Sequence, residues 1–68
     1  MAEMKPVRSS NVAAVGYEDG TLYVEFLSGA TYAYEGVDEA AYQDMLTASS
    51  PGSYLNRHIK DRHAVRRV

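Results

Sequence analysis

The fold is decided by residues 11–35, which read NVAAVGYEDGTLYVEFLSGATYAYE. The apolar run at 11–17 leads to Asp19-Gly20, a pair that favours a two-residue hairpin loop because both of its positions need positive φ. In the next run, 21–27, apolar and polar side chains alternate as in a half-buried strand. Ser28-Gly29 is a second turn signal, and Gly36 ends a third run at 30–35. The stretch therefore predicts an antiparallel meander of three strands.

Two-residue loops at both turns set an expected register. In this register Ala13 and Val15 lie opposite Phe26 and Val24, and Val24 also lies opposite Ala33. The core face is then expected to carry Ala13, Val15, Tyr17, Leu22, Val24, Phe26 and Ala33. The other face is expected to carry Val12, Ala14, Gly16, Tyr23, Glu25, Leu27, Tyr32 and Tyr34. A second loop longer by one residue would exchange the two faces of the third strand.

Two helices are expected after the strands. Asp38 is a good N-cap for the first helix. Ser50 followed by Pro51 is a start signal for the second helix, with Ser53 as an alternative cap, and this helix is expected to run to about Asp61. The apolar positions at helical spacing are Ala41, Tyr42, Met45 and Leu46 in the first helix and Leu55 and Ile59 in the second. We expect an α+β fold (β-β-β-α-α), a three-stranded antiparallel β-meander followed by two short α-helices packed on one face. Residues 1–9 are expected to form a flexible N-terminal arm, and residues 10–68 a single domain.

The composition limits which interactions can stabilise the chain and in which part of the cell we expect it. It has 68 residues and no cysteine, which excludes disulfides and thiolate zinc sites. No stretch approaches the roughly 20 apolar residues that span a bilayer, and residues 1–20 do not resemble a signal peptide. We therefore expect a cytoplasmic protein without a membrane partner.

Charge is distributed unevenly along the chain. The net charge is −2, yet residues 18–44 hold seven acidic and no basic side chains, whereas residues 45–68 hold five basic and one acidic. The five cations are Arg57, Lys60, Arg62, Arg66 and Arg67. Three interpretations remain open. The cations form a patch that follows a phosphate backbone, or they complement the helix dipole and pair with the acidic segment of the same chain, or the acidic and basic segments of different copies pair in a homo-oligomer.

Tyrosine is abundant, with six residues in the chain. Tyr32 and Tyr34 share a strand face because side chains alternate along a strand. Exposed rings on a sheet can stack on unpaired bases. Alternatively, the rings pack against the N-terminal arm, a helix edge or a partner subunit.

No catalytic or metal-binding motif stands out. His58 and His63 are five residues apart, a poor spacing for shared ligation on a helix, and no nucleophile motif, phosphate loop or pair of carboxylates at a defined spacing is present. We therefore expect no enzyme activity, no metal and no cofactor.

Several phrases of the chain resemble the KTSC domain, a short domain of bacteria and phages named for its place at the C-terminus of some lysyl-tRNA synthetases. These phrases are SSNVAAVGYE at 9–18, LYVEFLSGATYAYEGV at 22–37 and YLNRHIKDRHAVRRV at 54–68. The Tyr-x-Tyr motif matches Tyr32 and Tyr34, the phrase F-x-S-G-x-x-Y matches Phe26, Ser28, Gly29 and Tyr32, and the phrase Asn-x-x-Ile-[Arg/Lys] matches Asn56, Ile59 and Lys60. The chain contains no synthetase domain, so we expect the stand-alone form, and the family's association with synthetases suggests RNA as a partner.

The leading hypothesis is a non-catalytic module that contacts RNA or another nucleic acid. The candidate contact residues are Tyr32, Tyr34, Tyr54, Arg57, Lys60, Arg62, Arg66 and Arg67. The alternative is a protein-interaction or homo-oligomerisation module that uses the tyrosine face or an open sheet edge.

Overall fold

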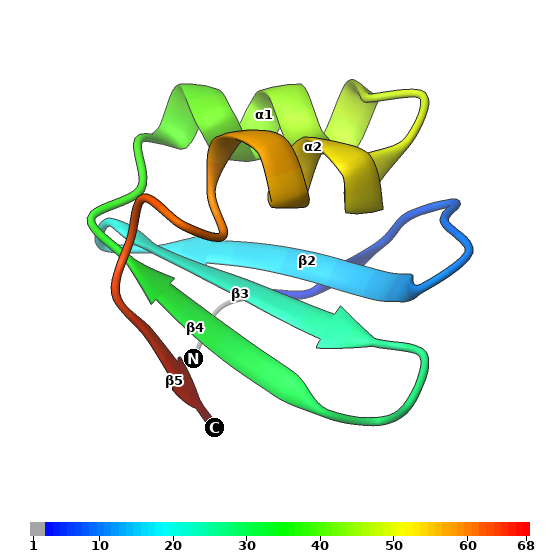
Figure 1. Cartoon of the computed structure of the whole chain (residues 1–68), viewed down its shortest axis with the longest axis horizontal. Coiled ribbons are helices and arrows are strands. Elements are labelled where there is room, and N and C mark those ends of the chain that lie inside the picture. Colours follow the sequence, from blue (N-terminus) through cyan, green and yellow to red (C-terminus); the bar gives the residue numbers. More distant parts are fainter. Residues whose placement is uncertain (1–2) are drawn as a thin grey trace.

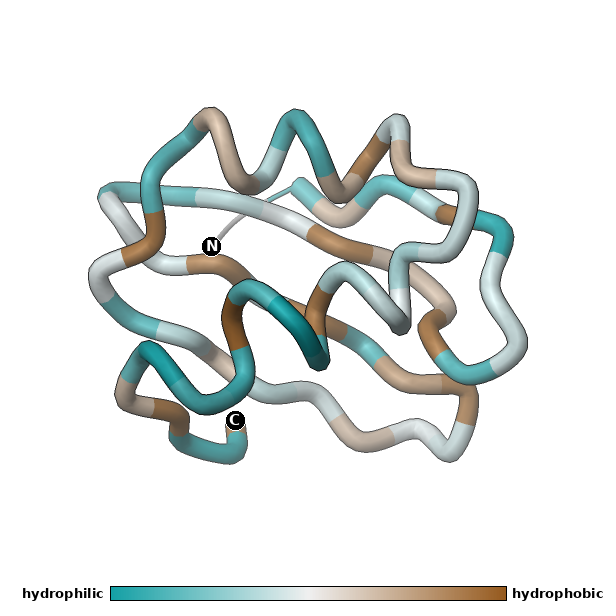
Figure 2. The backbone as a smooth tube through the Cα atoms, turned by 45° about the horizontal axis from the view of Figure 1, so that its top comes forward, coloured by the Kyte–Doolittle hydropathy of each residue, from teal (hydrophilic) through white to brown (hydrophobic). Residues whose placement is uncertain are grey.

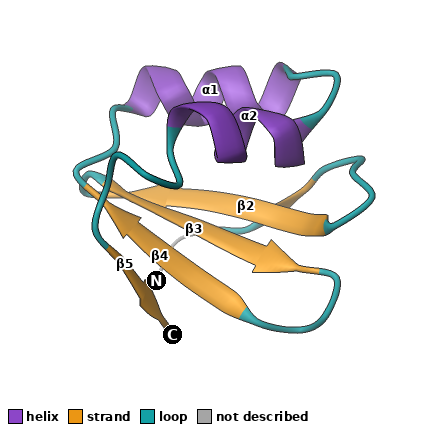
Figure 3. Ribbon diagram, in the orientation of Figure 1, coloured by secondary structure: helices purple, strands orange, loops and turns teal. Residues whose placement is uncertain are grey.

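An antiparallel sheet and a pair of helices form the two layers of the structure, a computed structural model that describes residues 3–68. Both helices lie on the same face of the sheet (Figures 1 and 3). The strands are β1 (Lys5–Pro6), β2 (Val12–Glu18), β3 (Thr21–Phe26), β4 (Thr31–Glu35) and β5 (Val65–Arg67), and the helices are α1 (Glu39–Thr47) and α2 (Pro51–His58). The α+β class and the placement of the helices agree with the sequence prediction.

The sheet has five strands, in the order β1-β2-β3-β4-β5, so the prediction of three was incomplete. Lys5 and Pro6, within the segment expected as a flexible arm, pair with Val15 and Ala14 of β2. At the other edge, β5 pairs with β4. Strands of two and three residues are too short to show an alternating pattern. Proline is suited to the outer strand because it has no N–H to donate to a further neighbour.

The first hairpin has the predicted register near its turn but not at its far end. Asp19 and Gly20 have φ values of 51° and 79°, and Val15 lies opposite Val24. Further along, an irregularity between Val12 and Ala14 puts Val12 opposite Phe26, where Ala13 was expected. The extra residue of such a bulge shifts the alternation, so Val12 enters the core and is 0% exposed.

The second hairpin differs from the expected two-residue turn. Phe26 N–H donates to the Ala30 carbonyl at 2.8 Å, and the three-residue loop at 27–29 ends with Gly29 at a φ of 98°. This is a type of hairpin in which a residue in the left-handed region follows a turn. The loop moves the register of β4 by one residue, so Tyr34 lies opposite Leu22 and Tyr32 opposite Val24.

This shift exchanges the faces of β4, and the prediction that Tyr32 and Tyr34 lie on the helix-free face is wrong. Both side chains lie on the face that carries the helices, and Ala33 lies on the open face opposite Tyr23. Tyr23 is thus the tyrosine of the sheet that remains on the open face. Ala33 is 0% exposed although no helix covers it (Figure 1), because larger side chains on the neighbouring strands flank it.

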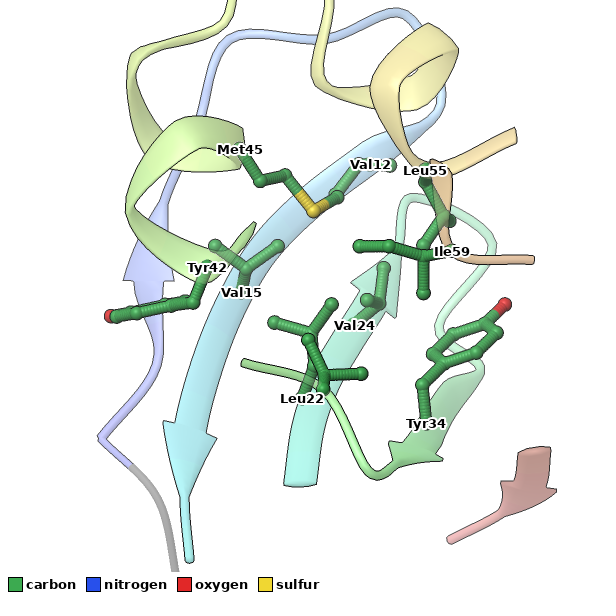
Figure 4. Packing of buried hydrophobic residues seen from close by; sticks show 10 residues of the cluster. Val12, Val15, Leu22, Val24, Tyr34, Tyr42, Met45, Leu55 and Ile59 are labelled. Carbon is green, nitrogen blue, oxygen red and sulfur yellow. The ribbon is translucent and has the colours of Figure 1, made fainter. Parts of the chain in front are cut away.

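The core lies between the sheet and the helices, where buried side chains from both layers point toward one another (Figure 4). Hydrophobic and hydrophilic positions alternate along the helices, and hydrophobic positions are present in both layers (Figure 2). The buried cluster comprises Val12, Val15, Leu22, Val24, Tyr34, Val37, Tyr42, Met45, Leu55 and Ile59. Phe26, Tyr17, Ala41 and Leu46 pack against it while partly buried, so most of the predicted core residues are confirmed.

A hydroxyl and two stacked rings join the start of α1 to the sheet. The Tyr17 hydroxyl donates to the Val37 carbonyl at 2.5 Å, and its ring stacks on Tyr42 with centroids 5.5 Å apart. Asp38 is the N-cap, as predicted.

The second helix begins at Pro51 as predicted but ends at His58, before the expected Asp61. Lys60 N–H donates to the Leu55 carbonyl at 2.8 Å and closes the last turn of α2. After this turn the chain continues toward β5.

Replacing Leu22 by alanine is expected to unfold a large part of the population. Leu22 is fully buried in the centre of the core, and truncation of such a leucine costs about 2–5 kcal/mol. A domain of this length has roughly 3–10 kcal/mol of stability in total. Urea unfolding followed by circular dichroism measures the loss. The control is Leu27→Ala, which removes the same atoms from a side chain that is 61% exposed, and a similar loss in both variants would contradict the assigned core.

Candidate functional site

A groove on the helix side of the sheet gathers aromatic and charged side chains from distant parts of the chain. We call it the aromatic groove. It has a volume of about 470 Å³ and is lined by Phe26, Tyr32, Tyr34, Lys60, Asp61 and Val65. These residues come from β3, β4, the turn after α2, and β5. The groove therefore exists because β5 returns along β4.

Tyr32 is the half-buried aromatic side chain of this groove. Its ring meets Phe26 edge-on, with centroids 5.6 Å apart and an interplanar angle of 74°. Arg67 lies directly opposite Tyr32 in the pairing of β4 with β5, and residues opposite one another project to the same face of a sheet. The register thus places an exposed guanidinium beside a partly exposed ring.

Tyr34 contributes to the core more than to the surface. Its side chain is 5% exposed and belongs to the same buried cluster as Leu22 and Ile59. Burial raises the pKa of the Tyr34 hydroxyl above its ordinary value, and the neighbouring Tyr32 raises it further. The ring offers no free face for stacking, so it has a different role from Tyr32 although the sequence motif pairs them.

Tyr54 lies in a separate place, where it connects the two helices. Its hydroxyl donates to the Asp44 carboxylate at 3.3 Å, and its ring centroid is 4.6 Å from that of His58. Burial raises the pKa of Tyr54, and the charge of Asp44 and the hydrogen bond to it add to the effect. It lines a hollow of about 400 Å³ together with Ala48, Ser49, Ser50, Ser53, Arg57 and His58, none of which lines the aromatic groove.

The five candidate cations lie in different surroundings. Lys60 and Arg67 are at the aromatic groove, Arg57 lines the hollow beside Tyr54, and Arg62 is exposed in the turn before β5. Arg66 lies opposite Ala33, on the face without helices. The structure therefore brings Tyr32, Lys60 and Arg67 together and separates them from the other three candidate cations.

Arg66 is engaged in an ion pair. Its Nε lies 2.9 Å from Oε2 of Glu35, and this hydrogen bond, with the charge of Glu35, raises the pKa of the guanidinium. Glu35 also holds the final strand through its backbone: its N–H donates to the Ala64 carbonyl at 2.9 Å, and its carbonyl lies 3.0 Å from His63 Nδ1. Three contacts of one residue thus hold β5 and the two residues before it against β4.

A second hollow, which sequence reasoning missed, adjoins the aromatic groove. We call it the hairpin hollow. It has a volume of about 420 Å³ and is lined by Ser10, Asn11, Phe26, Leu27, Ser28, Ala30 and Tyr32. Phe26 and Tyr32 line both this hollow and the aromatic groove. No residue pattern predicts it, because it forms where the three-residue hairpin loop meets the segment before β2.

The two histidines lie apart, in different surroundings. Across residues 3–68, no three histidine, aspartate or glutamate side chains are grouped so that they could hold a metal ion. His58 contacts the Tyr54 ring, whereas His63 contacts the backbone of Glu35. Neither α1 nor α2 is long and apolar enough to cross a bilayer.

Comparison with known proteins shows to which family the chain belongs. The model of the KTSC domain matches residues 8–63. A protein of Tsukamurella paurometabola is 39% identical over 61 residues, which cover 87% of this chain and 91% of that protein. An uncharacterized protein of Stutzerimonas stutzeri is 41% identical over 59 residues, which cover 84% of this chain and 83% of that protein.

A solved crystal structure is similar to this chain in both fold and sequence. The crystal structure of a KTSC domain protein from Yersinia pestis superposes with a TM-score of 0.93 at 33% identity, covering 100% of this chain and 99% of the other. These matches confirm the resemblance seen in the Tyr-x-Tyr and Asn-x-x-Ile phrases. The chain therefore belongs to the KTSC domain family.

Proposed function

We propose that this KTSC domain is a non-catalytic binding module that holds RNA or another nucleic acid in the aromatic groove. The observation that carries the proposal is the cross-strand pair of Tyr32 and Arg67, with Lys60 lining the same groove. A ring beside cations matches the two chemical features of nucleic acid, the flat base and the charged phosphate.

The ring is suited to a base because part of it remains accessible. Tyr32 is only half-buried, and its contact with Phe26 is edge-to-face rather than stacked. Stacking of a base on an aromatic side chain contributes about 1–3 kcal/mol. Tyr32 therefore supplies the contact to the base, and Tyr34 supports the floor of the groove from within the core.

The two cations are available to phosphate. Within residues 3–68, neither Lys60 nor Arg67 forms an ion pair, whereas Arg66 is held by Glu35. Asp61 lines the same groove, and the whole chain has a net charge of −2. Binding therefore depends on local rather than overall charge, and screening by salt should weaken it.

The variants Arg67→Gln and Arg66→Gln provide a matched test of the electrostatic contact. They remove the same charge from neighbouring positions of β5 whose side chains project to opposite faces. We expect Arg67→Gln to weaken binding of labelled single-stranded RNA and to lower the slope of log K against log salt by about 0.7, the value for one phosphate contact. Arg66→Gln should leave both quantities close to those of the unaltered protein, because the pairing of β5 with β4 and the backbone contacts of Glu35 still hold the strand in place. Equal losses would show that only net charge matters.

Two substitutions of Tyr32 test the stacking contact. Tyr32→Leu keeps apolar contact with Phe26 but removes the ring, and we expect an affinity about five- to a hundredfold lower. Tyr32→Phe keeps the ring and should bind within about twofold of the unaltered protein, because stacking does not use the hydroxyl. Fluorescence anisotropy measures both, and circular dichroism melting verifies that each variant is folded. Unchanged binding by the leucine variant would refute stacking at Tyr32.

A protein-interaction or homo-oligomerisation module is the second candidate, favoured by the open outer edge of β5. Val65 is 49% exposed there, and Val68, which follows it, is 56% exposed. An edge strand with apolar side chains can pair with another chain. If two copies pair in this way, light scattering at rising protein concentration will show a dimer, and Val65→Lys will return it to a monomer. A monomer throughout leaves nucleic-acid binding as the better explanation.

A further inference from the structure

The aromatic groove and the hairpin hollow form one continuous surface. Phe26 and Tyr32 line both, so the edge-on pair of rings stands as a ridge between them. Each side has a volume within the range of about 300–1,000 Å³ that is usual for sites of small ligands. A ligand that binds beside Tyr32 therefore has room on both sides of the ridge.

The two sides differ in charge. The aromatic groove contains Lys60 and Asp61, and Arg67 lies at its rim opposite Tyr32. The hairpin hollow is lined by no charged side chain and combines hydroxyl and carboxamide groups with apolar ones. Phosphate is therefore favoured on the first side, and an uncharged heterocycle with polar edges is favoured on the second.

Asn11 is held in a defined orientation at the hairpin hollow. Its Oδ1 accepts a hydrogen bond from the Ser9 hydroxyl at 2.9 Å, and its backbone carbonyl accepts one from Leu27 N–H at 2.9 Å. The α-carbon of Gly52 lies so close to the carboxamide that a Cβ there would overlap it. No hydrogen bond to a described residue uses Nδ2 of this exposed side chain, so it remains a donor for a ligand.

We propose that the groove binds single-stranded nucleic acid as a two-nucleotide step that straddles Tyr32, with one base in the hairpin hollow recognised by Asn11. This inference rests on the proposed function and specifies its ligand. One base stacks on Tyr32 in the aromatic groove, and the phosphate that joins the two nucleotides faces Arg67 and Lys60. The second base enters the hairpin hollow, where the Asn11 Nδ2 group donates to a ring nitrogen or carbonyl oxygen on its edge.

A duplex cannot make these contacts. Its bases are stacked on one another and paired, so neither can turn into the hairpin hollow without the cost of opening the helix. A duplex offers only phosphates to Arg67 and Lys60. The preference for single strands is therefore a direct consequence of the second hollow.

The experiment compares Asn11→Asp with Asn56→Asp. Both add one negative charge through the same change of an exposed asparagine, but Asn56 lies on α2 and lines neither side of the groove. Aspartate at position 11 can still accept from Ser9, so the local structure is retained while the donor is lost. Short oligouridylate and oligoadenylate strands and a hairpin duplex are titrated against both variants and the unaltered protein by fluorescence anisotropy.

We expect Asn11→Asp to bind at least one of the single strands about three- to tenfold more weakly, the loss of one hydrogen bond, and Asn56→Asp to match the unaltered protein. Single strands should bind at least about tenfold better than the duplex. A dinucleotide titrated into the unaltered protein should shift the NMR signals of Asn11 and Ser28 as well as those of Lys60 and Arg67.

The contrary results distinguish a failure of this inference from a failure of the proposed function. Signal shifts confined to the Lys60 side, equal binding of duplex and single strand, or equal effects of the two aspartate variants would overturn this inference and leave the proposed function in place if Arg67→Gln still weakens binding. No binding of any nucleic acid by the unaltered protein would overturn both.

Discussion

Gly29, at a φ of 98°, ends the loop whose length sets the register of β4, and the position of every aromatic side chain on that strand depends on it. One residue of register decides whether Tyr32 and Tyr34 face the helices or the open side, because side chains alternate along a strand. With the three-residue loop, Tyr34 completes the core and Tyr32 forms one wall of a groove. The open face carries Tyr23, Ala33 and charged side chains such as Glu25 and Arg66 instead.

A second constraint is the attachment of the C-terminal strand to Glu35. Its backbone N–H and carbonyl contact Ala64 and His63, and its carboxylate pairs with Arg66. Because β5 is only three residues long and all three are exposed, it has little buried area of its own to hold it. The register of β5 places Arg66 and Arg67 on different faces of the sheet. Arg66 forms an ion pair with Glu35, whereas Arg67 lies beside Tyr32 without an ion pair to a described residue. A basic segment that is continuous in sequence is thereby divided in space.

These two constraints place a local surface of aromatic and basic side chains on a chain with a net negative charge, and this is the surface proposed above for nucleic acid. The candidate site joins β3 and β4, near the middle of the chain, to Lys60 and Arg67 near its end. The adjoining hairpin hollow gives the same surface a neutral side, where polar groups rather than charges face the ligand. In the proposed complex, the cations Lys60 and Arg67 contribute affinity on one side of the Phe26–Tyr32 pair. The uncharged polar groups of the hairpin hollow select the ligand on the other side.

The sequence by itself determined the element types, the first turn, the starts of both helices and most of the core, because hydrophobic periodicity, capping residues and Asp-Gly act over a few neighbouring positions. The KTSC phrases were also recognisable from it. Only the tertiary structure decided the bulge at Val12, the loop at 27–29 and the two short edge strands. Each of these depends on pairing between segments, and a one-residue difference in pairing leaves no trace in local pattern. For the same reason the sequence could not separate the surroundings of Tyr32 from those of Tyr34, or those of Arg67 from those of Arg66.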